Sequence, residues 1–93
     1  MVIGILELQL YLYGVRSLKG KRSLLRPLLH RLRRKFNVSV LETGARDLWQ
    51  RSDVAVVCVA ATPALAHREL EAVLAFTQRE PGLEISDYTM EII

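Results

Sequence analysis

Cationic side chains recur between residues 16 and 34 at the spacing of one helix face. Lys19, Arg22 and Arg26 are three and four residues apart, so a helix would align them in one stripe. No acidic residue lies between positions 16 and 41. Because solvated helices usually alternate the sign of their charges, we predict a surface that neutralises phosphates; a merely hydrated helix face is the alternative. The candidate nucleic-acid contacts are Arg16, Lys19, Lys21, Arg22, Arg26, Arg33 and Arg34.

A second group of contact-forming side chains follows the second expected strand, where Arg46, Trp49 and Arg51 are candidate loop contacts. An exposed tryptophan between two arginines could stack on a base or anchor a protein partner. The alternative is that Trp49 folds beneath the edge of the sheet with Leu48, and we expect this burial because tryptophan is usually mostly buried. We also expect Asp47 to cap a single helical turn that ends at Arg51.

The residue types that usually perform catalysis are scattered. His30 and His67 fall on different expected helices without a nearby cluster of carboxylates, and Cys58 lies in an apolar segment. We therefore predict no catalytic residue, no cofactor and no metal site, and a protein that is not an enzyme. Residues 14–16 faintly resemble the phosphate-binding loop of acylphosphatases, but the connection between the second and third strands lacks an asparagine, so a hydrolase is our third hypothesis.

The elements that must position these residues follow from hydrophobic periodicity. Leucines alternate with polar residues over 6–13, which predicts a half-buried strand. From residue 18 onward, helical spacing predicts a core face that consists of Leu18, Leu25, Leu29, Leu32 and Phe36. Pro27 lacks the N–H group that a helix interior requires, so we expect regular helix to begin only near Ser23.

The second half of the chain predicts three further strands and a helix. Residues 38–43 and 53–61 are expected strands, and the latter is apolar on both faces and therefore central. Thr62 and Pro63 form a helix start, followed by a buried stripe that consists of Ala66, Leu70, Val73, Leu74 and Thr77. Residues 83–93 predict a last strand whose two halves differ in phase, which a bulge near Ser86 would reconcile.

The resulting order, βαββαβ with short connections, favours one architecture. Right-handed crossovers give a four-stranded antiparallel sheet with two helices on one face, the ferredoxin-like α+β sandwich. A chain of 93 residues has room for one core, so we expect residues 1–93 to form a single domain. The uncovered sheet face would carry Tyr11 and Tyr13, and we expect it to contact a second copy in a homodimer.

Composition and charge restrict the class of protein. Hydrophobic residues make up 51% of the chain and charged residues 25%, which excludes a disordered chain, and the single cysteine excludes a disulfide framework. No signal peptide is predicted, and the longest apolar run, residues 54–61, is too short to span a bilayer, so we expect a cytoplasmic protein without membrane contact. Residues 16–51 hold eleven of the thirteen basic residues and two acids, which predicts a polyanionic or acidic partner.

Three blocks of the sequence resemble the YlxP-like family of small bacterial proteins. They are Ser17-Leu18-Lys19-Gly20-Lys21-Arg22, then Arg31-Leu32-Arg33 with Phe36-Asn37-Val38-Ser39-Val40, and Asp47-Leu48-Trp49-Gln50-Arg51. The resemblance covers essentially the whole chain and implies no established function. Genes of the family often neighbour those of transcription-elongation and translation-initiation factors, which points to RNA or the ribosome. The sequence departs from the family at Gly20, where we expect an acid, and at Arg46, where a neutral or histidine side chain is common.

Together these features predict a binding protein whose partner is RNA or a ribosomal particle, held by the basic face of the first helix. The alternative is a protein-interaction module that grips an acidic protein with the Trp49 loop or with the open sheet face. The two hypotheses differ in which residues carry the binding energy, and the sequence alone leaves both open.

Overall fold

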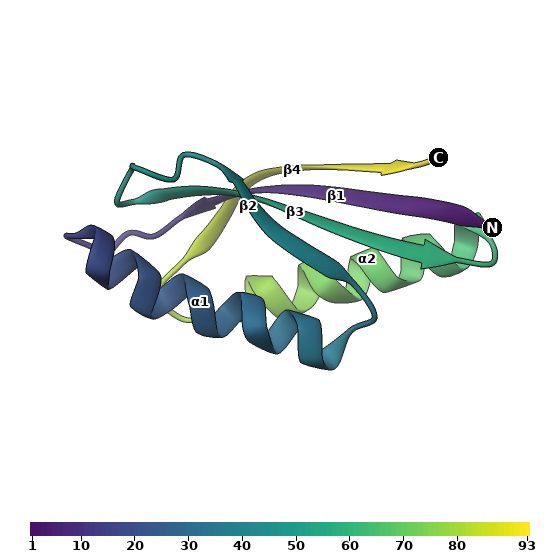
Figure 1. Ribbon diagram of the computed structural model, residues 1–93, viewed down its shortest axis with the longest axis horizontal. Coiled ribbons are helices and arrows are strands. Elements are labelled where there is room, and N and C mark those ends of the chain that lie inside the picture. Colours follow the sequence, from purple (N-terminus) through teal and green to yellow (C-terminus); the bar gives the residue numbers. More distant parts are fainter.

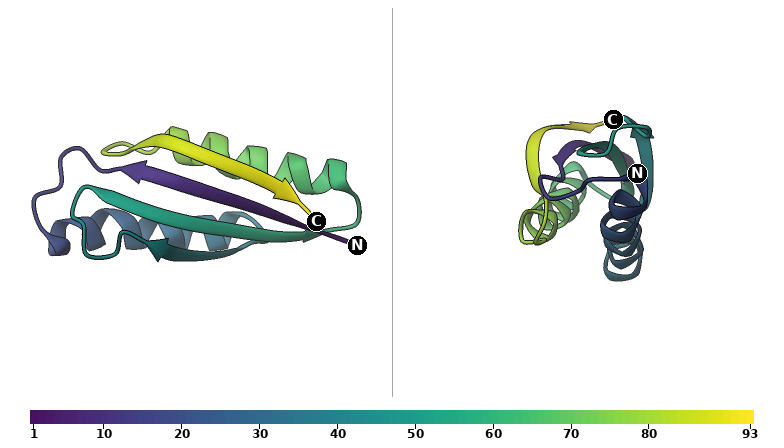
Figure 2. Two further views of the ribbon diagram at one scale, coloured as in Figure 1. Left: turned by 90° about the horizontal axis from the view of Figure 1, so that it is seen from above. Right: turned by 90° about the vertical axis from the view of Figure 1, so that its left-hand side faces the viewer.

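The computed structural model describes residues 1–93 and contains four strands and two helices in the order βαββαβ. The elements are β1 (Val2–Tyr11), α1 (Leu18–Lys35), β2 (Ser39–Gly44), β3 (Arg51–Ala60), α2 (Pro63–Gln78) and β4 (Glu84–Ile92). The strands form one antiparallel sheet in the order β2-β3-β1-β4 (Figure 1). The end-on view in Figure 2 shows both helices beneath one face of this sheet and the other face uncovered. The ferredoxin-like α+β prediction is confirmed.

The hydrophobic core lies between the sheet and the two helices. The leucines of the first strand, Leu6, Leu8, Leu10 and Leu12, are buried as their alternation predicts, and so is the complete stripe of α2, which consists of Ala66, Leu70, Val73, Leu74 and Thr77. Gly4 lets β1 approach α2 closely, because a Cβ atom at this position would lie 2.9 Å from the Cδ1 atom of Leu70. A larger residue there would force the side chains of Leu70 and Cys58 to shift in the packed core.

Helix α1 begins at Leu18 and continues through Pro27 to Lys35, so the expected start near Ser23 is wrong. The hydroxyl oxygen of Ser17 caps the helix by accepting a hydrogen bond from the Gly20 N–H at 2.9 Å. Pro27 is tolerated because it lies on the exposed side, and the carbonyl group that loses its amide partner belongs to the exposed Ser23. The basic residues on both sides of Pro27 therefore belong to one continuous helix.

The core face of α1 differs in detail from the predicted stripe. Leu25, Leu29 and Leu32 are buried as expected, whereas Leu18 and Phe36 are only half-buried. Two residues that the stripe omitted are buried as well, Leu28 and Lys21. The buried face of α1 therefore includes a charged residue, Lys21, which pairs with Glu42 on the neighbouring strand β2.

Strand registers set the geometry of the sheet edges. In the pairing of β1 with β4, Gln9 lies opposite Asp87 and Leu10 opposite Ile85, so Ser86 is the extra residue and the expected bulge there is confirmed. A second irregularity lies between Glu42 and Gly44 in the edge strand β2. It immediately precedes the β2–β3 hairpin loop and Ala45, whose φ of 57° lies in the left-handed region.

The β2–β3 hairpin loop does not contain the helical turn that we expected after Asp47. Instead, a turn closes between the carbonyl oxygen of Ala45 and the N–H of Leu48 at 3.1 Å, and β3 starts at Arg51. The Gln50 side chain, rather than capping a helix, donates to the carbonyl oxygen of Val15 at 3.1 Å. The loop is thus tied to the segment that connects β1 to α1.

Candidate functional site

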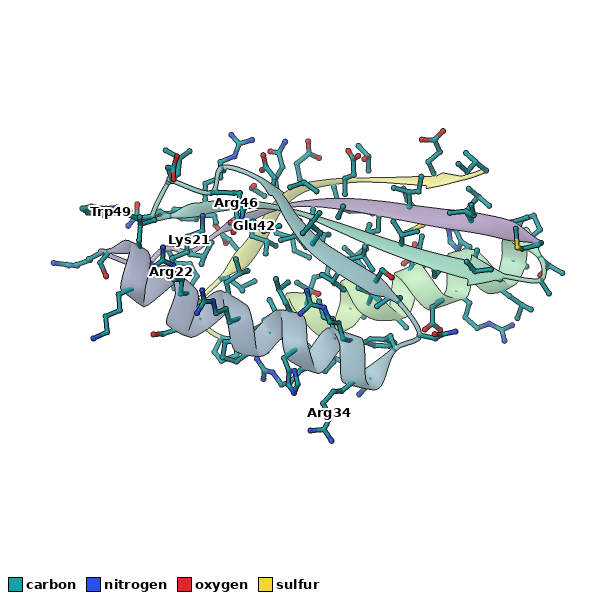
Figure 3. The ribbon with its side chains drawn as sticks, in the orientation of Figure 1. Lys21, Arg22, Arg34, Glu42, Arg46 and Trp49 are labelled. Carbon is teal, nitrogen blue, oxygen red and sulfur yellow. The ribbon has the colours of Figure 1, made fainter.

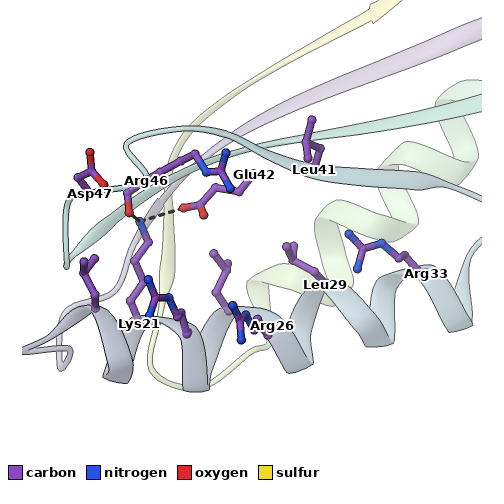
Figure 4. Close-up of a pocket in the computed structure, with 11 residues that line it drawn as sticks. Lys21, Arg26, Leu29, Arg33, Leu41, Glu42, Arg46 and Asp47 are labelled. Carbon is purple, nitrogen blue, oxygen red and sulfur yellow. Dashed lines mark hydrogen bonds and ion pairs between the residues drawn. The ribbon is translucent and has the colours of Figure 1, made fainter.

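A groove of about 550 Å³ lies between α1 and the edge strand β2 with its hairpin (Figure 4). Helix α1 contributes Arg22, Arg26 and Arg33 to its lining, and the hairpin contributes Arg46 from the opposite side. Apolar side chains of α1, among them Leu29, line it between the arginines. The groove therefore carries arginines on both walls, with apolar side chains between them, and the β2 side also contributes the carboxylates of Glu42 and Asp47.

Lys21 connects the two walls of the groove from inside the protein. Its ammonium group lies 2.9 Å from Glu42 Oε2 and donates to the carbonyl oxygen of Ala45 at 2.7 Å and, less closely, to that of Arg46 at 3.4 Å. The same carboxylate oxygen accepts a hydrogen bond from the buried hydroxyl of Ser52 at 2.7 Å. The Lys21 side chain is 3% exposed and that of Glu42 is 18% exposed, so this ion pair is largely shielded from water.

The prediction that Lys21 is one of the seven surface contacts is therefore corrected, because this side chain is buried. Lys21 lies in the groove lining, but its side chain is almost fully buried and its ammonium is engaged by Glu42 and the hairpin carbonyl groups, so it holds the hairpin against α1. A signal for this role was present in the sequence. Lys21 lies at helical spacing between the apolar Leu18 and Leu25, and Glu42 shares the inward face of its strand with the buried Val40.

The other six predicted contacts of α1 and its entrance are exposed, and none of them pairs with a carboxylate. They do not form one surface, however. Arg22 and Arg46 lie toward the same end of the molecule and line the groove from opposite walls, whereas Arg34 lies toward the far end of α1 and points away from the sheet (Figure 3). Arg33 donates to the carbonyl oxygen of Val40 at 2.8 Å, which holds it against β2. The structure thus gathers a subset of the predicted cations.

The carboxylates near the groove leave its arginines without an ion-pair partner. Glu42 and Asp47 both line the groove (Figure 4), but Glu42 Oε2 is engaged by Lys21 and Ser52, and neither carboxylate lies within ion-pair distance of a groove arginine. Two arginines elsewhere on the molecule do pair, Arg31 with Glu80 and Arg51 with Asp53. Arg51 is therefore partly neutralised where the sequence suggested a free cation.

Trp49 and Leu48 are 53% and 54% exposed, so the expected burial of both beneath the sheet edge is wrong. Figure 3 shows Trp49 at the same end of the molecule as Arg22 and Arg46. The hairpin is too tightly tied to fold its tip under the sheet, because Gln50 bonds the β1–α1 connection and Lys21 bonds Ala45. The alternative reading of the sequence, an exposed tryptophan flanked by arginines, describes the observed loop.

Other residue types with chemical potential are dispersed. No three His, Cys, Asp or Glu side chains lie close enough together to hold a metal ion, and neither helix is long and apolar enough to cross a membrane. Cys58 lies in the core, and burial raises the pKa of its thiol above its ordinary value of 9.0. This thiol therefore stays protonated at neutral pH, which suits a packing role.

Comparison with known proteins assigns almost the whole chain to one family. Residues 3–90 match the family described as protein of unknown function (DUF503). The chain is also 39% identical over 83 residues to the uncharacterized protein YlxP of Bacillus subtilis (strain 168), an alignment that covers 89% of this chain and 90% of that protein. The resemblance predicted from three sequence blocks is thereby confirmed, and the chain belongs to the YlxP-like family of proteins of unknown function (DUF503).

Proposed function

We propose that this protein binds RNA through the groove between α1 and the β2–β3 hairpin. One observation carries the proposal: Arg22 and Arg26 on the helix and Arg46 on the hairpin line the same groove, and none of the three forms an ion pair within the protein. Unpaired guanidinium groups on a common groove repel one another, and a bound polyanion relieves that repulsion. Arg16 and Lys19 extend the cationic surface at the start of α1.

Guanidinium geometry favours phosphate as the group that is bound. Each arginine presents parallel N–H donors that match two phosphate oxygens, and the delocalised charge is weakly hydrated. Two walls that both carry arginine can contact successive phosphates of one backbone, which a single flat stripe of cations does less well. A contact set of this kind recognises the backbone and is insensitive to base sequence.

The hairpin wall is held in place before any ligand arrives. Lys21 fixes the carbonyl groups of Ala45 and Arg46, so the backbone that carries the Arg46 side chain is tied to α1. A groove that is already formed loses less conformational entropy on binding than one that must close around its ligand. The buried lysine thus supports the binding that it was first expected to perform directly.

Fluorescence anisotropy with a labelled RNA tests the proposal. Between about 0.05 and about 0.5 M salt, contact with about five phosphates predicts that log K falls against log salt with a slope of roughly −3.5 to −4.5. Replacing two groove arginines together, Arg22→Gln with Arg26→Gln, should reduce the magnitude of the slope by about 1.4 to 1.8. The matched control is Arg68→Gln with Arg79→Gln, which removes the same charge from exposed arginines at α2 and its C-terminal end.

Three results would overturn the proposal. Binding that is absent or independent of salt would remove the phosphate contacts altogether. Equal losses in the two double variants would assign the effect to net charge rather than to the groove. Displacement of the RNA by polyglutamate at equal charge concentration, or tighter binding of DNA of the same sequence, would point to an acidic protein or to DNA as the partner.

A further inference from the structure

Beside the cationic groove, the tip of the β2–β3 hairpin presents an aromatic surface that nothing described so far explains. A shallow hollow of about 590 Å³ is lined there by Tyr11, Asp47, Leu48, Trp49, Gln50 and Arg51. Trp49 is 53% exposed and Tyr11 is 40% exposed. Leaving large apolar rings in water is unfavourable, and such surfaces usually contact a partner.

The loop that carries Trp49 is anchored on both sides. Before the tryptophan, the carbonyl oxygen of Ala45 accepts bonds from Lys21 Nζ and from the Leu48 N–H. After it, the backbone carbonyl of Gln50 accepts a bond from the Leu12 N–H at 2.9 Å, and the Gln50 side chain donates to Val15. The ring is therefore presented to solvent on a fixed backbone, which lowers the entropy lost when a flat partner stacks on it.

The hollow and the groove adjoin, since Asp47 lines both. Arg46, which precedes Asp47, belongs to the groove, and Arg51 lies in the hollow. A strand of nucleic acid could therefore lay phosphates against the groove and place a base on Trp49. The Asp47 carboxylate repels phosphate and accepts hydrogen bonds from the amino groups of bases, so it favours this orientation over the reverse.

We propose that the hairpin tip is a base-stacking platform and that the RNA bound by this protein is single-stranded. This inference rests on the proposed function. In an A-form duplex the bases are stacked on one another and the faces of their rings are covered. A splayed base in a single strand offers the flat face that Trp49 can cover, and such stacking tolerates any base. An acidic protein partner explains the aromatic ring but gives no preference between single-stranded and duplex RNA.

The test compares two probes made from the same RNA. One is an unstructured CA-repeat strand of about 12 nucleotides, and the other is its duplex with the complementary strand. Trp49 is the only tryptophan, so stacking of a base should quench the intrinsic fluorescence of the wild-type protein. Trp49→Ala should weaken binding of the single strand between about fivefold and about a hundredfold and leave duplex affinity within about twofold.

Two further variants serve as controls. Trp49→Phe keeps a ring at the position and should recover most of the single-strand affinity. Tyr88→Ala removes a ring that is 44% exposed on β4, outside the hollow, and should leave both affinities unchanged. Circular dichroism of each variant checks that the fold is intact.

The outcomes separate this inference from the proposed function. If RNA binding stays salt-dependent and sensitive to Arg22 and Arg26, but Trp49→Ala has no more effect than Tyr88→Ala, the stacking platform is wrong and the groove stands. Equal losses for single strand and duplex also contradict the platform. Absence of binding to either probe removes both proposals.

Discussion

A single lysine shows how a charged residue can serve the site without touching a ligand. Lys21 is buried against Glu42 and two hairpin carbonyl groups, and all three of its hydrogens have acceptors within reach. Desolvation of an ammonium group is offset only when its hydrogen bonds are satisfied in this way. The lysine thus converts a flexible hairpin into one wall of a groove.

Replacing Lys21 with methionine should therefore be costly. The variant Lys21→Met leaves the Glu42 carboxylate without its cation, removes one of the two donors to the Ala45 carbonyl and removes the donor to the Arg46 carbonyl, and we expect the free energy of unfolding to fall by about 3 kcal/mol. Urea denaturation measures this loss. The matched control, Lys19→Met, removes an exposed lysine two residues away and should change stability by less than about 0.5 kcal/mol.

A second variant distinguishes loss of the ion pair from general damage to packing. Lys21→Met combined with Glu42→Leu removes both charges, and part of the lost stability should return, since an apolar pair needs no hydrogen bonds. Equal stability of Lys21→Met and Lys19→Met would contradict the structural role that we assign to the buried lysine.

At the scale of elements, α2 and the strands could be predicted from the sequence and α1 only in part. In α2 a proline start, a threonine cap and an uninterrupted apolar stripe all indicate the same structure. In α1, Pro27 suggests a late start, but whether a proline breaks a helix depends on which side of the helix faces water. The apolar stripe of α1 indicates that side, but the expectation of a late start gives more weight to the missing N–H group of Pro27 than to the exposure of its position.

The candidate site was less predictable because its parts are far apart in the chain. Residue types revealed which arginines could bind phosphate, but whether a given arginine faces the groove, as Arg26 does, or points away, as Arg34 does, depends on where β2 docks. The exposure of Trp49 likewise follows from hydrogen bonds of the hairpin to Lys21 and to the β1–α1 connection, which no local pattern encodes.

Loss of the N-terminal cap of α1 should lower both stability and RNA affinity, whereas loss of the cap of α2 should lower stability alone. Each helix has a hydroxyl cap, Ser17 for α1 and Thr62 for α2, and replacing either with alanine should cost about 1 kcal/mol in urea denaturation. Only Ser17→Ala frays the turn that carries Lys19, so only this variant should also weaken RNA binding. If Thr62→Ala weakened binding equally, overall stability rather than the geometry of α1 would control affinity.

At the scale of the whole molecule, the uncovered sheet face has a mainly apolar half and a polar half. Ile3 pairs with Val59 and Ile5 with Val57, and strand alternation places these four apolar residues on the uncovered face. Glu91 of β4 lies opposite Ile5 and borders this apolar group on the same face. Toward the other end of β1, the same face carries Glu7 and then the polar pair Gln9 and Asp53. The carboxylates of the polar half repel RNA, so we expect RNA to bind on the helix side of the sheet and the apolar half of the open face to have a different partner.

This division leads us to expect that the apolar half of the open face meets a second copy of the chain. Light scattering should then give about twice the mass of 10.6 kDa, and Val59→Glu should reduce it to one chain, because two buried carboxylates would face each other across a twofold axis. Val59 is 59% exposed, so the variant should fold normally, and Thr89→Glu adds the same charge to the polar half as a control.

RNA affinity per chain should survive Val59→Glu, since the groove lies on the helix side of the sheet. A wild-type mass of one chain would contradict the dimer and leave the RNA proposal untouched, because the groove is completed by α1 and the hairpin of a single chain.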